Sequence, residues 1–163
     1  MADRVKNLRD GQLVIKDGSG TPKTLTVLFM RGDLRWTVAN DNKIVYNRGS
    51  IHHARNGNDV PCKLSFSAGW VQLIGKSVSA GEANQLYEMV LNRSSTYTTT
   101  GTACEPFQLT YEFTVTDSCD SKNEKIAFAN VMTDSVECAE GEEENTISFS
   151  GTSLTTKPTI SRV

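Results

Sequence analysis

The stretch FQLTYEFTV, residues 107–115, decides the fold class of this 163-residue chain. Its odd positions are all apolar and alternate with Gln, Thr and Glu. Side chains along a strand point to opposite faces in turn, so this pattern predicts a strand with one buried face. The segment TISFSG, residues 146–151, repeats the alternation, and residues 125–136 between them are rich in Ile, Phe and Val. Polar, turn-like segments separate the three, which predicts an antiparallel meander.

Further strands are predicted in the first half of the chain. Residues 24–30 and 34–39 flank the triplet Arg31-Gly32-Asp33, whose Gly and Asp suit a tight turn, so we expect a hairpin there. The same triplet occurs in integrin ligands, but the turn is the favoured interpretation. Residues 63–74 form another predicted strand, with Leu, Phe and Ala on one face and Lys and Ser on the other.

One helix is predicted over residues 81–92, where Leu86, Met89 and Val90 recur at helical spacing after a capping-box pair of Ser and Glu. The apolar stripe favours packing of this helix against a sheet. Many short strands with one helix predict a mainly β fold, an antiparallel β-sandwich or barrel with one flanking α-helix. The length fits one domain, residues 1–163.

Two segments do not have the pattern of a core. Residues 40–61 are polar, contain several Asn and Gly residues, and would form a long protruding loop. Long connections in a compact domain usually have a use, so this loop attracts a functional hypothesis. Residues 93–102 are rich in Ser and Thr and are expected to form an exposed loop or a twisted edge strand.

Charge is distributed unevenly along the chain, although the net charge is only -2. Residues 1–63 carry 11 Lys and Arg against 6 Asp and Glu, a net charge of +5. Residues 64–163 carry 6 against 13, a net charge of -7. Two solvated surfaces can differ in this way by chance, and a self-complementary subunit would also produce the difference.

Residues for catalysis or metal binding do not gather into a recognisable pattern. The sequence has no GxSxG elbow and no glycine-rich phosphate loop, and its only histidines, His52 and His53, would point in opposite directions on an extended strand. The acidic run 137–144 is interpreted as a solvated hairpin tip, and residues 117–124 lack the ligand order of a calcium loop. We therefore predict no enzyme activity, no metal site and no cofactor.

Cysteine and tryptophan residues support no specific site either. The four cysteines lie far apart, without a CxxC pair, and are expected to be free thiols: Cys62, Cys104, Cys119 and Cys138. Trp36 and Trp70 fall within strand patterns and are expected in the core, although either could line a sugar-binding surface. No apolar run of roughly 20 residues and no apolar signal segment is present, so the chain is expected to stay where it is made.

Two segments carry a resemblance to a known family. RGSIHHARNGNDVPCKLSFSAGW, residues 48–70, and the ending 127–152, in which an acidic turn leads into NTISFSGT, resemble the major tail tube protein of siphovirus bacteriophages. The order of the predicted elements is also similar to that family. The resemblance implies subunits that form hexameric rings, stacked head to tail around a channel through which DNA is ejected into the host.

The resemblance also implies roles for two groups of residues. The loop at 40–61 would reach the neighbouring ring, and the acidic run would either line the lumen or form the acidic partner face that receives this loop. The implied ring-stacking residues are Lys43, Arg48, Ile51, His52, His53 and Arg55. The implied acidic residues are Glu137, Glu140, Glu142, Glu143 and Glu144.

The implied partners are further copies of this chain, other tail proteins such as the tape measure, tail tip and terminator, and DNA in transit without sequence-specific binding. The implied location is the tail of the virion, after assembly in the cytoplasm of the host bacterium. The alternatives are a tail terminator, a connector or a secretion-tube relative, and, in a different class, a carbohydrate-binding β-sandwich.

Overall fold

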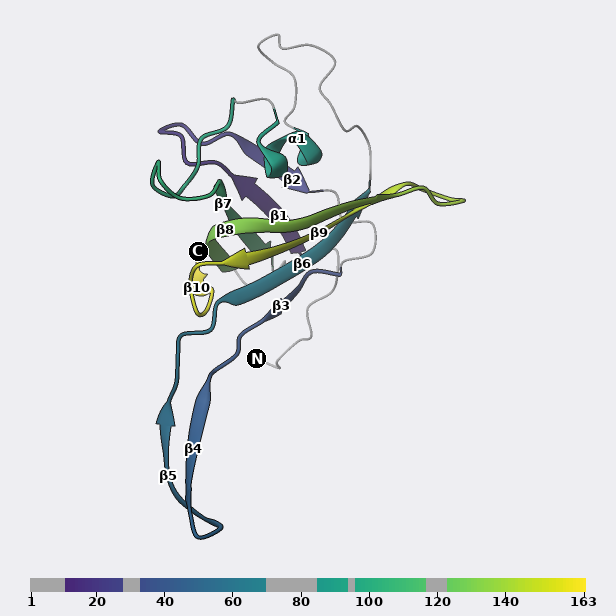
Figure 1. Ribbon diagram of the computed structural model, residues 1–163. Coiled ribbons are helices and arrows are strands. Elements are labelled where there is room, and N and C mark those ends of the chain that lie inside the picture. The colour runs from purple at the N-terminus through teal and green to yellow at the C-terminus, as the bar shows by residue number, and fades with distance from the viewer. Residues whose placement is uncertain (1–10, 28–32, 70–84, 94–95, 117–122) are drawn as a thin grey trace, which may run out of the picture.

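The computed structural model describes residues 11–27, 33–69, 85–93, 96–116 and 123–163. Within these ranges the chain is mainly β, with antiparallel strand pairs and one short helix (Figure 1). In chain order the elements are β1 (Gly11–Lys16), β2 (Thr24–Val27), β3 (Arg35–Thr37), β4 (Asn42–Asn47), β5 (Ser50–Asn56), β6 (Cys62–Gly69), α1 (Leu86–Leu91), β7 (Gln108–Val115), β8 (Glu124–Ala139), β9 (Thr146–Ser153) and β10 (Thr159–Arg162).

Eight strands form one sheet in the order β2-β1-β7-β8-β9-β6-β3, with β10 paired to β8 beside this path. The predicted meander is confirmed, because β7, β8 and β9 are antiparallel neighbours. β6 and β9 alternate buried and partly exposed side chains, as their sequence patterns predict. Within the described residues this path ends in the edge strands β2 and β3, and β10 is paired on one side only, so no closed barrel forms.

The long strand β8 bends, and the sheet folds over onto itself. Tyr111 of β7 is paired with Phe128 of β8, whereas Phe149 of β9 is paired with Val136, eight positions further along. A straight strand would separate those two positions by about 26 Å. The rings of Tyr111 and Phe149 nevertheless stack with their centroids 5.2 Å apart. The two halves of the sheet therefore pack face to face, as in a sandwich, and Figure 1 shows β1 and β7 behind β8, β9 and β6.

The side chains enclosed by this folded sheet form the core. They come from β1, β2, β6, β7, β8 and β9, from the helix residues Met89 and Val90, and from Tyr97. Leu86, Met89 and Val90 pack as the helical spacing predicts, although Leu86 is only partly buried. Asn92, in the left-handed conformation, ends the helix. Residues 81–84 and the capping-box pair Ser79 and Glu82 lie outside the described residues.

The predicted hairpin between residues 24–30 and 34–39 is wrong. β2 pairs with β1, and β3 pairs with β6, so the two strands lie at opposite edges of the sheet. β1 was not predicted, although Leu13 and Ile15 lie two positions apart, between Gln12 and Lys16, and are fully buried. Turn residues indicate where a chain reverses locally, but backbone hydrogen bonding does not depend on side-chain identity and leaves the pairing partner open.

The Ser- and Thr-rich segment 93–102 is more closely attached to the body than an exposed loop. Tyr97 is buried in the core, and the backbone N–H of Thr98 donates to the Asp17 carboxylate at 3.1 Å. The N–H of Gly18 donates to the carbonyl of Thr98 at 2.8 Å. No strand forms in its described residues, 93 and 96–102. The described residues of this segment therefore form a loop that is hydrogen-bonded to the connection between β1 and β2.

Candidate assembly interface

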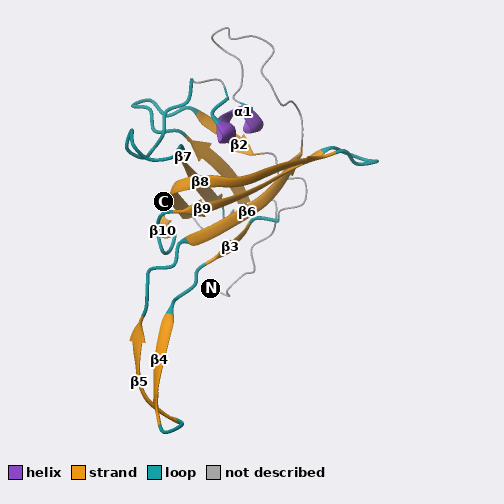
Figure 2. Cartoon of the chain, in the orientation of Figure 1, coloured by secondary structure: helices purple, strands orange, loops and turns teal. Residues whose placement is uncertain are grey.

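Strands β4 and β5 form a two-stranded arm that extends away from the sheet (Figure 2). Residues 40–61 are thus largely a hairpin and not a structureless loop. The turn at its tip is Arg48-Gly49, and both residues have positive φ angles, 49° and 83°. This combination defines a two-residue turn whose twist matches that of the flanking strands. Gly49 adopts such a φ without steric strain, and the short turn sets the register of the arm.

The base of the arm is closed by Asp41. Its carbonyl accepts the N–H of Gly57, and its carboxylate accepts the N–H of Asn58 at 3.0 Å. The Lys43 ammonium lies 3.0 Å from the same carboxylate. The hydrogen bond from Asn58 and the nearby Lys43 lower the pKa of Asp41 below its ordinary value. These contacts hold the two strands together where they leave the body.

Strand register divides the arm into two unlike faces. Ile44 is opposite Ala54, and Tyr46 is opposite Ile51, so these four side chains share one face. The exposed fractions of Ile44, Tyr46 and Ile51 are 48%, 61% and 68%. We call this surface the apolar face of the arm. Lys43 opposite Arg55, and Val45 opposite His53, form the other surface, the basic face.

The two histidines do not point apart as the sequence predicts. The register shifts between Val45 and Tyr46, which leaves His52 as the extra residue of a β-bulge. The bulge turns the adjacent rings together, with their Nδ1 atoms 2.8 Å apart. The prediction assumed an uninterrupted strand, and the bulge breaks its alternation. Across the part of the chain that the structure describes, no three His, Cys, Asp or Glu side chains gather in a group that could hold a metal ion.

The six predicted stacking residues thus lie together on the arm, but they do not share one face. Lys43, His53 and Arg55 lie on the basic face, and Ile51 lies on the apolar face. Arg48 occupies the turn, and His52 is the extra residue of the bulge. Ile44 and Tyr46, which complete the apolar face, were not among the predicted interface residues. The sequence could have predicted them, because a two-residue turn at Arg48-Gly49 fixes which residues of the two flanking strands lie opposite each other.

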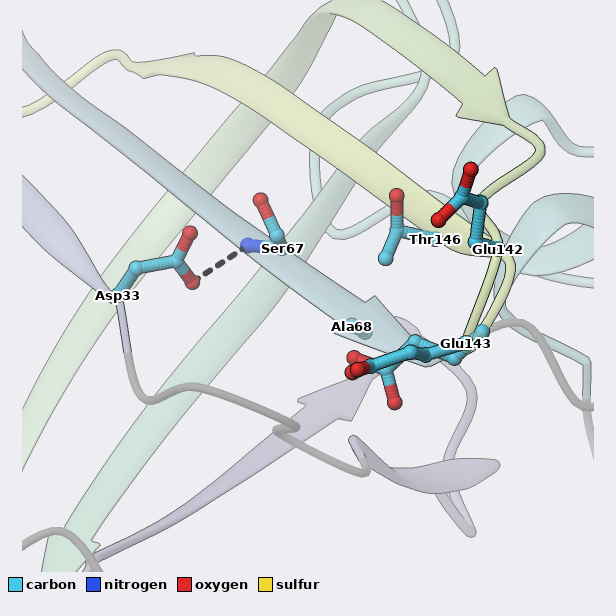
Figure 3. Close-up of a pocket in the computed structure, with 8 residues that line it drawn as sticks. Asp33, Ser67, Ala68, Glu142, Glu143 and Thr146 are labelled. Carbon is cyan, nitrogen blue, oxygen red and sulfur yellow. Dashed lines mark hydrogen bonds between the residues drawn. The ribbon is translucent and has the colours of Figure 1, made fainter.

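The predicted acidic residues lie on the β8–β9 hairpin, well away from the arm (Figure 1). Glu142, Glu143 and Glu144 line a pocket of about 610 Å³ together with Asp33, Ser67 and other residues. Figure 3 shows Asp33 bonded to Ser67 at one end of this pocket, with the glutamates at the other. The Asp33 carboxylate accepts the N–H of Ser67 at 2.8 Å.

The remaining acidic residues, Glu137 and Glu140, are exposed on the same hairpin but do not line that pocket. Glu137 lies on β8 opposite Ser148, on the outer face of the sheet. The structure therefore brings three of the five predicted glutamates together in one concave acidic surface, and leaves two beside it.

Trp36 is not buried in the core as predicted. It lies on the edge strand β3, opposite Leu64, and its exposed fraction is 40%. Its ring makes an edge-to-face contact with Phe128, with a centroid distance of 6.0 Å. An edge strand has no neighbour to cover the outer side of a large ring, so Trp36 closes the side of the core and remains half exposed. Trp70 lies outside the described residues.

The described cysteines are free: Cys62 is buried, and Cys104 and Cys138 are exposed. Cys119 lies outside the described residues. The helix that the structure describes is too short to span a bilayer.

Comparisons with known proteins assign no family. No protein-family model matches the sequence, and no curated protein matches it. One similar solved structure is described as the cryo-EM structure of the anti-feeding prophage (AFP) baseplate, 6-fold symmetrised. The superposition has a TM-score of 0.48 at 8% identity, covering 100% of this chain and 97% of that chain. A likeness at this level defines neither the family nor the function of this chain.

Proposed function

We propose that this chain is a structural protein of a phage-type tail, whose copies stack as hexameric rings to form the tail tube that conducts DNA. The resemblance of residues 48–70 and 127–152 to tail tube proteins suggests this function. The proposal assigns no catalytic activity to the chain. Its location would be the virion tail, and its partners would be other copies of itself and other tail proteins.

The exposed arm is the structural observation that carries the proposal. A two-stranded hairpin is marginally stable in water without a surface to pack against. This arm also exposes Ile44, Tyr46 and Ile51 on one face. Contiguous apolar surface on a soluble protein usually marks a contact site. A subunit whose arm reaches another copy would bury this face and order the hairpin at the same time.

Charge supports a contact between unlike surfaces of neighbouring copies. Residues 42–56 contain Lys43, Arg48 and Arg55 and no acidic residue. The β8–β9 hairpin carries five glutamates between residues 137 and 144. Head-to-tail assembly joins two different faces of the same protein, so a basic arm and an acidic hairpin on one chain are complementary. In the proposed tube, the acidic hairpin receives the basic face of an arm; the alternative role for these glutamates is to line the lumen.

Assembly of purified protein tests the proposal. Concentrated wild-type protein is expected to form long tubes in negative-stain electron microscopy and to sediment rapidly. Reversing Arg48 and Arg55 to Glu should block tube growth while leaving the thermal unfolding midpoint unchanged. The matched control reverses Arg35 and Lys63 on the outer face of β3 and β6, and it should still assemble.

A charge swap separates the two roles of the acidic hairpin. If Glu142 and Glu143 receive the arm, replacing both with Lys should restore growth to the arm variant that carries Glu at positions 48 and 55. If the glutamates instead line the lumen, the swap should not restore growth. Unchanged assembly of the arm variant itself would contradict the proposed stacking role of the arm.

The size of the assembled species separates the related virion functions. Long tubes favour the tail tube, whereas single rings favour a tail terminator or a connector. A secretion-tube relative would also form tubes, and would be distinguished by the genes that neighbour its own.

Exposed Trp36 favours one candidate function of a different class. A half-exposed indole at a sheet edge is a surface on which a sugar ring can stack, so a carbohydrate-binding β-sandwich is the second candidate. Titration with oligosaccharides should then shift the tryptophan fluorescence, and Trp36→Ala should abolish the shift. An unchanged spectrum across a panel of sugars would remove this candidate.

A further inference from the structure

The apolar face of the arm is exposed in the part of the subunit that the structure describes. The arm forms a sheet of its own, separate from the eight-stranded sheet, and Figure 1 shows it extending away from the body. Ile51 at its far end has an exposed fraction of 68%, larger than that of Ile44 nearer the base, which is 48%. Exposure of these side chains therefore increases toward the tip of the arm, which extends away from the body of the subunit (Figure 1).

Further apolar side chains are exposed elsewhere on the chain. Some of the exposed large hydrophobic residues lie on β3, on the segment after it or on the arm. The others among the described residues are Leu91, Leu154, Ile160 and Val163. Three of these four follow one edge of β8. The N–H of Leu154 donates to the carbonyl of Asn130, Ile160 is opposite Ile126, and Val163 pairs with Asn123.

Ile160 is the most exposed residue of this edge, at 69%. Its register partner Ile126 packs against the core, and directly opposite residues share a face, so Ile160 continues the apolar side of the sheet beyond its cover. Leu154, at 49%, lies in the connection between β9 and β10. We call Leu154 and Ile160 the β10 edge.

We propose that the apolar face of the arm docks on the β10 edge of a second copy of this chain. The two surfaces lie on different parts of the subunit, so their contact is heterologous and can repeat from copy to copy. The basic face of the arm then remains available for the acidic β8–β9 hairpin of a further neighbour. These two surfaces carry opposite charges. This inference rests on the proposed self-assembly, and it specifies which face of the arm is buried and against what.

Photo-crosslinking tests the contact in assembled protein. A benzophenone amino acid replaces Tyr46 on the apolar face, and the matched control replaces His53 on the basic face. Assembly is measured by sedimentation before irradiation, and crosslinked peptides are identified by mass spectrometry. The position-46 probe should join two copies through a peptide containing residues 154–160, and the position-53 probe should not.

Each outcome has a distinct meaning. Assembled protein in which the position-46 probe crosslinks another segment, or gives no crosslink between copies, overturns the docking inference and leaves the tube function standing. Wild-type protein that stays monomeric at high concentration overturns the proposed function, and with it the inference.

A pair of substitutions tests the same contact without a probe. Ile160→Asp places a charge in the proposed contact, and it should reduce the assembled fraction at least tenfold. Thr159→Asp adds the same charge at the adjacent exposed position, on the other face of β10, and should assemble like the wild type. Both sites are exposed in the monomer, so unfolding midpoints should match. Equal assembly of the two variants would contradict the docking inference.

Discussion

The ring of Tyr111 on β7 stacks on the ring of Phe149 on β9, with their centroids 5.2 Å apart and 27° between their planes. The ring of Phe66 on β6 also stacks on the ring of Phe149, with a centroid distance of 5.0 Å. Three rings from three strands thus meet in the centre of the folded sheet. The contact joins the two halves of the sheet, so it stabilises the overall bend as well as the local packing.

The two stacked rings should respond differently to mutation. Phe149→Ala is expected to lower the free energy of unfolding by about 3–5 kcal/mol, because it leaves a cavity in the core. Tyr111→Phe should leave stability unchanged or raise it by roughly 1 kcal/mol, because the buried Tyr111 hydroxyl has no hydrogen-bond partner among the described residues. Burial also raises the pKa of Tyr111 well above its ordinary value. Urea unfolding of both variants measures the difference, and a strongly destabilised Tyr111→Phe variant would show that the hydroxyl is satisfied after all.

Asn130 has a φ of 51° and lies at the register shift between β7 and β8, so we expect the bend of β8 to depend on it. A left-handed conformation is tolerated by Asn and Gly but disfavoured for β-branched residues. Asn130→Gly should therefore leave the unfolding free energy nearly unchanged, whereas Asn130→Val should lower it by about 1–2 kcal/mol. Thermal unfolding followed by circular dichroism measures both. Equal midpoints would mean that the strand bends without the left-handed residue.

Acid should destabilise the fold through Asp17. This buried carboxylate accepts N–H groups of Lys23 at 2.7 Å and Thr98 at 3.1 Å, and the Ser19 hydroxyl at 2.7 Å. Burial raises the pKa of Asp17, but these hydrogen bonds outweigh it and hold the pKa below its ordinary value of 3.8. Since the folded-state pKa is the lower one, the stabilisation is present above the unfolded-state pKa and is lost as pH falls through the folded-state pKa.

Asp17→Asn provides the matched test of this pH dependence. The variant should lose about 1–3 kcal/mol at pH 7, because the amide replaces one acceptor oxygen with a donor. Its unfolding free energy should then vary less than that of the wild type as the pH is lowered from 5 to 2. Parallel pH profiles for the two proteins would show that another carboxyl group dominates the acid response.

The arm turn should control assembly without affecting the body. Gly49 has a φ of 83°, so Gly49→Val should strain the turn and disorder the arm tip. Tube formation should fall sharply while the unfolding midpoint of the body stays within about 2 °C, because the arm belongs to a separate sheet. Arg48→Asn retains a residue suited to positive φ and removes one charge, so it should weaken assembly less. The sedimenting fraction of each variant measures the effect.

The local pattern of the sequence was sufficient for most of the strands. Alternation at residues 107–115 and 146–151 identifies β7 and β9 with their buried faces, because the period of two is a property of the extended backbone itself. The strand predicted at 63–74 corresponds to β6 over residues 63–69, and residues 70–74 lie outside the described residues. The Leu86, Met89 and Val90 spacing identifies the short helix in the same way. The position of the basic segment on one protruding element, and of the acidic run at a hairpin tip, also follows from local composition.

Only the tertiary structure decided which strands pair, where β8 bends and how each interface is composed. β2 and β3 separate to opposite edges because their backbone groups can pair with any strand, and packing of the core selects β1 and β6. The bulge at His52 turns two rings together that an uninterrupted strand would hold apart. The sequence alone determined that residues 40–61 are polar and basic; the register of the folded arm determined that Ile44, Tyr46 and Ile51 share a single exposed face.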